Sequence, residues 1–327
     1  MLFIRPTVAL VGIELIRAVP LGGGNVVKQR TIAETVSCIG TGLHSGQPVQ
    51  LTLRPAPVDT GVEFMRTDRA HRTLVRMHPS TVKSTRRSTT LGCGEVTIGT
   101  VEHLCSALFG LGIDNVRAEV DGPELPIMDG SAAPFVYLLR SAGLVKQTAA
   151  RRVLRIRRPL EIREGNHSIR IEPARAFRVK YAVEFDHPAI GRQVFRVDAP
   201  DKEHFERELS AARTFGFLRE VRSLWKAGFA RGGSLDNTVL LDENGVVNAD
   251  GLRWPDEFVR HKVLDLYGDL AVLGLPIQAR IKVERGGHAL HHKLVAAIVD
   301  HPEAWSIEDP DSREPRGLDF VPAPAPA

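Results

Sequence analysis

A histidine and an aspartate four residues apart could bind one metal ion together. His261 and Asp265 have this spacing, and on an α-helix of about 3.6 residues per turn their side chains project from one face. Imidazole nitrogen and carboxylate oxygen are both ligands that zinc accepts. Asp269 follows one turn later and could orient an imidazole. A solvated ion pair is the alternative, but the apolar flanks favour a buried helix, in which charges need partners or a metal.

The pair Glu102-His103 is a second candidate. A glutamate beside a histidine is by itself most often ordinary surface. This pair, however, opens a hydrophobic helical segment that has no further charged residue before Asp114. It would hold a metal ligand and a carboxylate close together on one rigid element.

A third candidate, His288, follows Gly286 and Gly287 between a predicted strand and a predicted helix. The glycines would let the backbone turn tightly, so that the imidazole faces whatever lies at that edge. The alternative is a loop histidine with no role. His291 and His292 come next, and His288 with His291 could form a rival metal pair. We disfavour that pair because no carboxylate stands beside it.

Motifs of several other enzyme classes are missing from the sequence. H-E-x-x-H is absent, which excludes a zincin. The G-x-S-x-G elbow of serine hydrolases and the G-x-x-x-x-G-K-[ST] phosphate loop are absent as well.

Composition indicates a globular protein of ordinary type. The 327 residues suggest two domains, and no apolar run reaches the roughly 18 residues of a membrane span. Three cysteines without a C-x-x-C pair argue against a disulfide scaffold or a cysteine zinc site, and favour a reducing compartment. The net charge of +4 suits an anionic substrate, whereas no Lys/Arg block is long enough to bind nucleic acid. Residues 8–16 are apolar but interrupted by Glu14, so we expect no secretory signal.

Hydrophobic periodicity places the candidate residues on predicted elements. Helices are predicted over residues 100–111, 131–142, 202–212, 218–227, 255–273 and 289–299. Strands are predicted over residues 31–39, 49–54, 61–67, 115–120, 153–162, 168–172, 177–185, 238–241 and 277–283. The elements are grouped and do not strictly alternate, which favours the α+β class over a doubly wound parallel sheet. The halves share an order of elements, which suggests an internal duplication, and the polar segment 146–152 is predicted to link them.

Several short segments carry a family resemblance. They are TVEHL at residues 100–104, GLGIDN at 110–115, PIMDGSAAPF at 126–135, ARTFGF at 212–217, GGS at 232–234, DEFVRHK at 256–262 and GHAL at 287–290. In this order they resemble the UDP-3-O-acyl-N-acetylglucosamine deacetylases of lipid A biosynthesis. The resemblance extends over about residues 28–304.

The resemblance implies a two-domain α+β fold, in which each domain layers helices against sheets and the active site lies between the domains. We therefore expect a flexible N-terminal extension over residues 1–27 and a first domain over residues 28–148, with Glu102 and His103. The second domain would cover residues 149–305, with His261 and Asp265, and a tail would follow over residues 306–327. Residues 216–248 would match the family's insert that forms the acyl-chain passage.

The resemblance also implies roles for individual residues. Zn²⁺, or alternatively Fe²⁺, would be bound by His103, His261 and Asp265. Glu102 would be the general base, and His288, oriented by Asp269, would be the cationic group. Thr214 would contact the oxyanion. Substrate contacts would come from Lys262, Phe215, Gly233 and Ser234.

The implied reaction is the hydrolysis of the N-acetyl group of UDP-3-O-acyl-N-acetylglucosamine to acetate and a free amine. Three protein ligands leave zinc one open position, as in catalytic sites. We expect a cytoplasmic monomer that binds this acylated UDP-sugar, binds no nucleic acid, has no transmembrane segment and contacts the membrane surface at most transiently.

Two alternatives stay open at this point. One is a zinc amidase acting on another acylated sugar or a peptide. The other is a nucleotide-sugar-binding or lipid-binding protein with a structural zinc, whose fourth ligand would be His291 or His292. The chain departs from the family at residues 1–27, at His291-His292, where asparagines are common, and at Gly92, which replaces a cysteine of some members.

Overall fold

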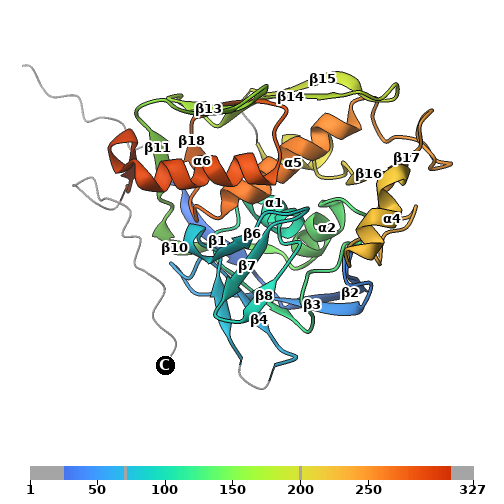
Figure 1. Cartoon of the computed structure of the whole chain (residues 1–327). Helices are drawn as coiled ribbons and strands as arrows, with labels where there is room; N and C mark the ends of the chain where they lie inside the picture. The colour runs from blue at the N-terminus through green and yellow to red at the C-terminus, as the bar shows by residue number, and fades with distance from the viewer. Residues whose placement is uncertain (1–25, 70–71, 199–200, 311–327) are drawn as a thin grey trace, which may run out of the picture.

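The computed structural model describes residues 26–69, 72–198 and 201–310. Two five-stranded sheets enclose two layers of helices (Figure 1). Helices α1 (Glu102–Leu111) and α2 (Ala133–Ser141) belong to the first half of the chain, and α5 (Glu257–Ala271) and α6 (His288–Asp300) to the second. The layers run sheet, helices, helices, sheet, with the two pairs of helices in the middle. The predicted α+β class with two similar halves is confirmed.

The sheet of the first half has the order β2-β3-β9-β4-β5. Its strands are β2 (Val36–Thr41), β3 (Pro48–Pro55), β9 (Val116–Val120), β4 (Val62–Arg66) and β5 (Leu74–Arg76). Neighbouring strands are antiparallel except β4 and β9. In β3 the apolar residues Val49, Leu51 and Leu53 alternate with polar ones and are buried, because successive side chains of a strand point to opposite faces.

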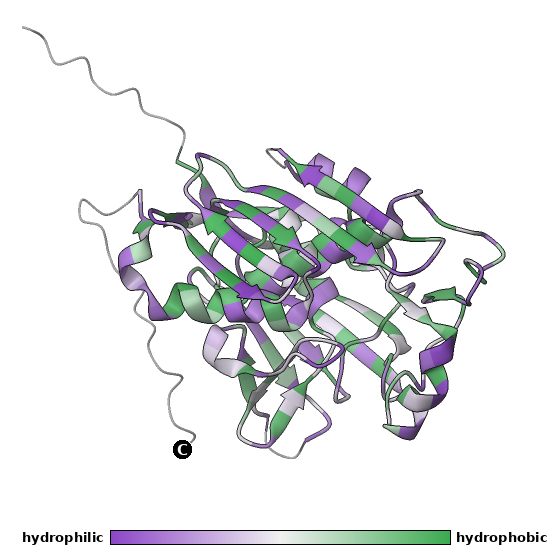
Figure 2. Ribbon diagram, turned by 45° about the horizontal axis from the view of Figure 1, so that its top comes forward, coloured by the Kyte–Doolittle hydropathy of each residue, from purple (hydrophilic) through white to green (hydrophobic). Residues whose placement is uncertain are grey.

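The sheet of the second half repeats this topology, with the order β12-β13-β19-β14-β15. Its strands are β12 (Leu160–Glu164), β13 (His167–Glu172), β19 (Arg280–Glu284), β14 (Arg178–Phe185) and β15 (Gly191–Val197). Here too only one pair, β14 and β19, is parallel. Purple and green alternate along these strands (Figure 2), which is typical of a sheet with one buried face. Each sheet thus inserts a later strand between two hairpins, in agreement with the predicted duplication.

The helices that occupy equivalent places in the two halves pack against each other. α1 precedes the inserted strand β9, and α5 precedes the inserted strand β19. The two helices approach closely at Gly268, where an added Cβ would lie 2.1 Å from the carbonyl oxygen of Glu102. α1 ends at Gly112, whose left-handed φ of 67° suits glycine. The duplicated architecture therefore brings the candidate residues of α1 and α5 to one interface.

Smaller elements complete the fold. Paired or grouped strands are β1 (Lys28–Ile32) with β10 (Leu144–Ala150); β11 (Val153–Ile156) between β18 (Ile277–Gln278) and β20 (Trp305–Glu308); β6 (Val82–Ser84), β7 (Thr90–Cys93) and β8 (Val96–Ile98); and β16 (Phe215–Phe217) with β17 (Val239–Leu241). The remaining helices are α3 (Lys202–Glu208), α4 (Leu218–Lys226) and the short 3-10 helices η1 (Pro79–Thr81) and η2 (Pro302–Ala304). None of the helices in the described ranges has the length and apolar character needed to cross a membrane.

Two predicted boundaries differ from the structure. Segment 146–152, predicted as a linker, is strand β10 as far as Ala150, so the boundary at 148/149 falls inside a strand. The segment is polar because β10 is largely exposed while its backbone pairs with β1. The predicted tail, 306–327, begins inside β20, which pairs with β11. Residues 1–25 and 311–327 lie outside the described residues.

Candidate metal centre and active site

Three potential metal ligands meet where α1 packs against α5. α1 supplies His103, and α5 supplies His261 and Asp265; one ligand atom from each lies within 4.8 Å of the others. Nε2 of His261 is 3.3 Å and Nε2 of His103 is 3.9 Å from Oδ1 of Asp265. All three side chains are buried. We refer to these three residues as the triad.

Hydrogen bonds occupy one atom each of His261 and Asp265 and leave the atoms that face the other ligands free. Nδ1 of His261 donates to the carbonyl oxygen of Ala212 at 3.0 Å, so Nε2 can present a lone pair. Nζ of Lys262 donates to Oδ2 of Asp265 at 2.7 Å. Oδ1 of Asp265 has no hydrogen-bond partner among the described residues. A buried carboxylate oxygen without a donor is costly unless a cation or water meets it, so the triad fits a divalent metal ion.

The protonation states of the triad also suit a metal. Burial and then His261 lower the pKa of His103 to about 3, and burial lowers the pKa of His261. Burial would raise the pKa of Asp265, but His261 and Lys262 outweigh it and hold the pKa below its usual range. At neutral pH the triad therefore presents two neutral imidazoles and one carboxylate, the forms that bind metal. This donor set is typical of catalytic zinc sites that keep an open position.

Glu102 lies beside the triad, in the first turn of α1. Its Oε2 accepts the backbone N–H of Thr89 at 3.1 Å, and its Oε1 is 3.9 Å from Nε2 of His288. Burial raises the pKa of Glu102 to about 8, against the opposing pull of His288. A carboxyl group whose pKa is raised in this way can exchange a proton near neutral pH.

His288, the first residue of α6, faces Glu102 and the triad. Its Nδ1 donates to Oδ2 of Asp269 at 2.7 Å, and its Nε2 lies 3.9 Å from Oδ2 of Asp265. Burial lowers the pKa of His288, but Asp269, Asp265 and Glu102 raise it more strongly, to about 9. The imidazole is therefore a cation at neutral pH, with an N–H beside the triad.

Asp269 is the centre of a second cluster, of which sequence reasoning predicted only the pairing with His288. Besides His288, Nδ1 of His291 donates to Oδ2 at 2.7 Å, and the hydroxyl of Thr89 donates to Oδ1 at 2.6 Å. Nε2 of His292 is 3.0 Å from that hydroxyl. The expectation that no carboxylate accompanies His288 and His291 is wrong, because α5 supplies one from a different part of the sequence. Thr89 lies in a run of serines and threonines that gives no signal of its place here.

The segment before β16 runs along α5 beside the triad. Ala212 accepts the hydrogen bond from His261, and the ring of Phe215 lies 6.3 Å from the ring of His261. Nζ of Lys262 is 5.6 Å from the centre of the Phe215 ring. Two of the predicted substrate contacts thus lie beside the triad: Phe215 next to His261, and Lys262 next to Asp265. Thr214 lies in the chain between the two contacts with His261.

Gly233 and Ser234 lie in the loop between α4 and β17. Their backbone N–H groups donate to the carbonyl of Ala230 at 3.3 Å and to Oδ1 of Asn237 at 2.9 Å, within the same loop. Among the described residues, no hydrogen bond connects either residue to the triad. Their role as substrate contacts therefore stays a prediction.

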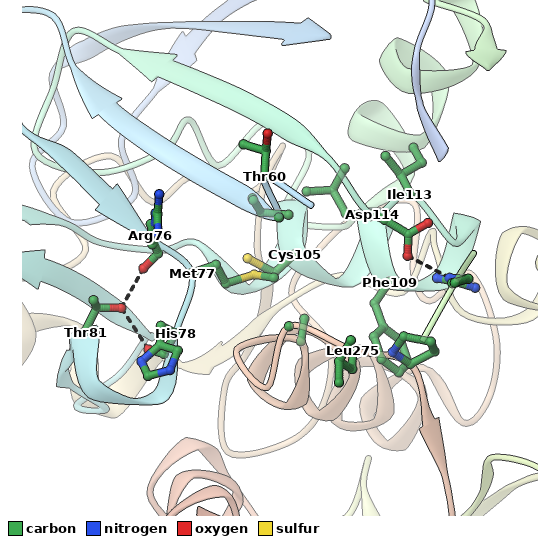
Figure 3. A pocket seen from close by; sticks show the side chains of 17 residues that line it. Thr60, Arg76, Met77, His78, Thr81, Cys105, Phe109, Ile113, Asp114 and Leu275 are labelled. Carbon is green, nitrogen blue, oxygen red and sulfur yellow. Dashed lines mark hydrogen bonds and ion pairs between the residues drawn. The ribbon is translucent and has the colours of Figure 1, made fainter. Parts of the chain in front are cut away.

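A cavity of about 270 Å³ lies elsewhere on the α1–α5 pair (Figure 3). Met77, Cys105 and Leu275 contribute apolar wall, and Asp114 pairs with Arg151 at 2.7 Å on its lining. None of the predicted catalytic or metal-binding residues lines this cavity. This cavity is therefore separate from the site formed by the triad, and that site is defined by the positions of its side chains.

Comparison with known proteins agrees with this geometry. A family model described as UDP-3-O-acyl N-acetylglycosamine deacetylase matches residues 29–300. A protein of Myxococcus xanthus is 48% identical over 290 residues, which cover 89% of this chain and 92% of the relative. A protein of Anaeromyxobacter sp. is 49% identical over 274 residues (84% and 89%), and one of Acidithiobacillus ferrooxidans is 46% identical over 286 residues (87% and 94%). All three are named UDP-3-O-acyl-N-acetylglucosamine deacetylase. The chain therefore belongs to the UDP-3-O-acyl N-acetylglycosamine deacetylase family.

Proposed function

We propose that this chain hydrolyses the N-acetyl amide of UDP-3-O-acyl-N-acetylglucosamine, a step of lipid A biosynthesis, and releases acetate and the free sugar amine. The relatives carry the name of this activity. The observation that carries the proposal for this chain is the meeting of the triad, Glu102 and His288 in one buried place. One chain supplies all of these groups, so we further propose that it acts as a monomer. The free cysteines Cys38, Cys93 and Cys105 suit the reducing cytoplasm, which we propose as its location.

The triad would hold the metal ion. Its donor set and the free Oδ1 of Asp265 support Zn²⁺, with Fe²⁺ as the alternative. When bound, zinc would supply Lewis-acid polarisation of a carbonyl and lower the pKa of bound water towards about 7. Lys262, held at 2.7 Å from Oδ2 of Asp265, supports the orientation of this carboxylate and keeps two further N–H donors for a substrate.

Glu102 and His288 would move the protons of the reaction. Glu102 takes the proton of the attacking water as the water oxygen bonds to the acetyl carbon. His288 is a cation with an N–H on the same side, so it can protonate the sugar nitrogen as the carbon–nitrogen bond breaks. The products are acetate and an amine. Asp269 holds His288 in its orientation through the 2.7 Å hydrogen bond.

The remaining predicted residues would bind and orient the substrate. The hydroxyl of Thr214, in the segment beside His261, would donate to the developing oxyanion, a contribution typically worth about 3–4 kcal/mol. Lys262 and Phe215, at the edge of the triad, would meet the sugar nucleotide. Gly233 and Ser234 would contact a more distant part of the same substrate.

The segment 216–248 would receive the acyl chain. Its helix α4 has no buried residue, and Leu218 and Trp225 are 48% and 54% exposed. Covering this apolar surface with an acyl chain would contribute about 0.8 kcal/mol per buried methylene. Arg222 and Lys226 on the same helix suit brief contact with an anionic membrane surface.

An acetate-release assay tests the proposal directly. Zinc-loaded protein should release acetate from the acylated UDP-sugar and much more slowly from the analogue that lacks the acyl chain. Glu102→Gln should lower kcat by at least about 100-fold and leave one zinc bound, whereas Glu95→Gln, at an exposed turn, should leave both unchanged. Absence of acetate release from the zinc-loaded protein would contradict the deacetylase function.

The two alternatives give different results in the same assay. An amidase for another substrate would treat both UDP-sugars alike and prefer a different amide. A binding protein with a structural zinc would bind the metal and the nucleotide sugar without turnover. His291 and His292, the candidate fourth ligands of such a site, instead bond to Asp269 and Thr89, which favours the enzyme.

A further inference from the structure

Two buried side chains extend the hydrogen bonds of Asp269 into the second sheet. His291 donates from Nδ1 to Oδ2 of Asp269 at 2.7 Å. On the other side of the same ring, the hydroxyl of Tyr181, from β14, is 2.9 Å from Nε2 of His291. Both side chains are fully buried. Neither belongs to the triad or to the groups that would move protons, so their pairing needs its own explanation.

A donor and an acceptor can be assigned to each hydrogen bond in this group. A carboxylate can only accept, so Nδ1 of both His288 and His291 must carry the hydrogen. Burial lowers the pKa of His291, which leaves its Nε2 bare at neutral pH. Burial raises the pKa of Tyr181 well above its usual range, so the phenol keeps its proton and donates it. Tyr181 therefore donates to His291, and His291 donates to Asp269.

The backbone leaves space for this pair at one glycine. A Cβ on Gly286 would lie 2.4 Å from Cγ1 of Val283, 2.6 Å from the Tyr181 hydroxyl and 3.2 Å from Nε2 of His291. Gly286 does not have a positive φ, and Gly287 is extended. The first glycine of the Gly286-Gly287-His288 motif thus provides space beside Val283 and the Tyr181–His291 pair, and its backbone conformation does not itself require glycine.

We propose that Tyr181 and His291 are positioning residues of the deacetylase, an inference that rests on the function proposed above. An aspartate carboxylate rotates readily about its last side-chain bond. His291 on Oδ2 and Thr89 on Oδ1 fix this rotation. Oδ2 then stays where it meets Nδ1 of His288, and Nε2 of His288 stays 3.9 Å from Glu102 and from Asp265. Tyr181 fixes His291 in turn.

Steady-state kinetics of the zinc-loaded protein test this role. Tyr181→Phe should lower kcat about 3- to 10-fold, the range expected for one lost neutral hydrogen bond, with KM unchanged because neither residue touches the substrate. His291→Ala removes the donor to Asp269 and should lower kcat by about 10- to 100-fold. The amide nitrogen of His291→Asn can take the place of Nδ1 and should recover the level of Tyr181→Phe. The double variant Tyr181→Phe, His291→Asn should then be no slower than either single one.

Tyr267→Phe is the matched control. Tyr267 is a second buried tyrosine, but its hydroxyl has no hydrogen-bond partner among the described residues. Its replacement should leave kcat and KM unchanged. Wild-type kcat for Tyr181→Phe, or equal losses in Tyr181→Phe and Tyr267→Phe, would overturn the proposal.

A spectroscopic measurement separates this inference from the function on which it rests. In protein labelled with nitrogen-15 at histidine, the Nδ1–H protons of His288 and His291 should be slow to exchange with solvent. Tyr181→Phe should shift and speed the exchange of the His291 signal and then of the His288 signal, while Tyr267→Phe should change neither. Unchanged signals in Tyr181→Phe would overturn the positioning role. Zinc-loaded wild-type protein that releases no acetate would overturn the deacetylase function, yet the histidine signals would still report whether Tyr181 acts on Asp269.

Discussion

Helix α5 supplies the aspartate of each of two histidine–aspartate clusters one turn apart, and the clusters differ in how closely their atoms approach. In the triad, the imidazole nitrogens of His261 and His103 lie 3.3 and 3.9 Å from Oδ1 of Asp265. In the second cluster, the nitrogens of His288 and His291 lie 2.7 Å from Oδ2 of Asp269. Both clusters combine two histidines with one aspartate, and of these six residues only His288 is partly rather than fully buried.

The difference is what lies between the polar atoms. At 2.7 Å a hydrogen fills the gap, and Asp269 accepts a donor on each oxygen. In the triad, Oδ1 of Asp265 makes no hydrogen bond with any described residue. A cation can therefore satisfy Asp265, whereas Asp269 is already satisfied. Hydrogen-bond partners, and not residue types, separate the predicted metal site from the group that orients His288.

Removing the aspartate of one cluster or of the other should affect zinc content differently. Asp265→Ala is expected to have the largest effect, because it removes a proposed metal ligand and with it a Lewis acid worth several kcal/mol, so kcat/KM should fall by at least about 1,000-fold. Elemental analysis of the purified variant should find little zinc. One equivalent of tightly bound zinc in Asp265→Ala would contradict the assignment of the triad.

Asp269→Asn should lose activity and keep the metal. Without the carboxylate, His288 loses both its orientation and its stabilising charge, and kcat should fall by about 100- to 10,000-fold, the range of general acid catalysis. Zinc content should stay near one equivalent. Loss of zinc together with activity would instead identify the second cluster as part of the metal site.

The layered fold could largely be predicted from sequence. The periodic segments around α1, α5 and α6 gave the helices, and the grouping of strands gave the α+β class. β15 was missed because charged and polar residues occupy its exposed face and dilute the apolar pattern. β10 was mistaken for a linker for the same reason. Strands at the edges of sheets need only one buried face, so their sequences resemble loops.

The candidate site was predicted where residues share a helix or a family motif, and missed where they meet only in space. The spacing of His261 and Asp265 placed both on one helical face, and the structure brings His103 to them from α1. Nothing in the sequence indicated that Thr89 and His291 bond to Asp269 or that Tyr181 bonds to His291, since these four residues come from separate parts of the chain. Gly268, which allows α1 and α5 to touch, is likewise an ordinary helical residue in the sequence.

The pH dependence of kcat/KM should differ between the wild-type protein and Asp269→Asn, by less than the loss of activity itself. His288 must be protonated to act as an acid, so activity should fall as pH rises through its pKa, which lies at about 9. Burial lowers this pKa, and Asp269 is the largest of the charges that raise it. Asp269→Asn removes that charge, so the alkaline limb of the residual activity should move to lower pH. The acidic limb follows deprotonation of Glu102 and should move much less. An unmoved alkaline limb would show that the limb belongs to another group.

Thr89→Val should have the smallest effect. It tests a residue that bonds both to Glu102, beside the triad, and to Asp269, in the second cluster. The Thr89 hydroxyl donates to Oδ1 of Asp269 at 2.6 Å, while its backbone N–H donates to Glu102 at 3.1 Å. Valine has nearly the same shape; it removes the hydroxyl contacts with Asp269 and His292 and keeps the backbone N–H, so kcat should fall about 3- to 10-fold and the free energy of unfolding by about 1 kcal/mol. Thr89→Ser keeps the hydroxyl and should stay close to wild type in kinetics and chemical denaturation. Zinc content should not change in either variant, because the triad does not depend on this hydroxyl; a loss of zinc in Thr89→Val alone would mean that the two clusters act as one site.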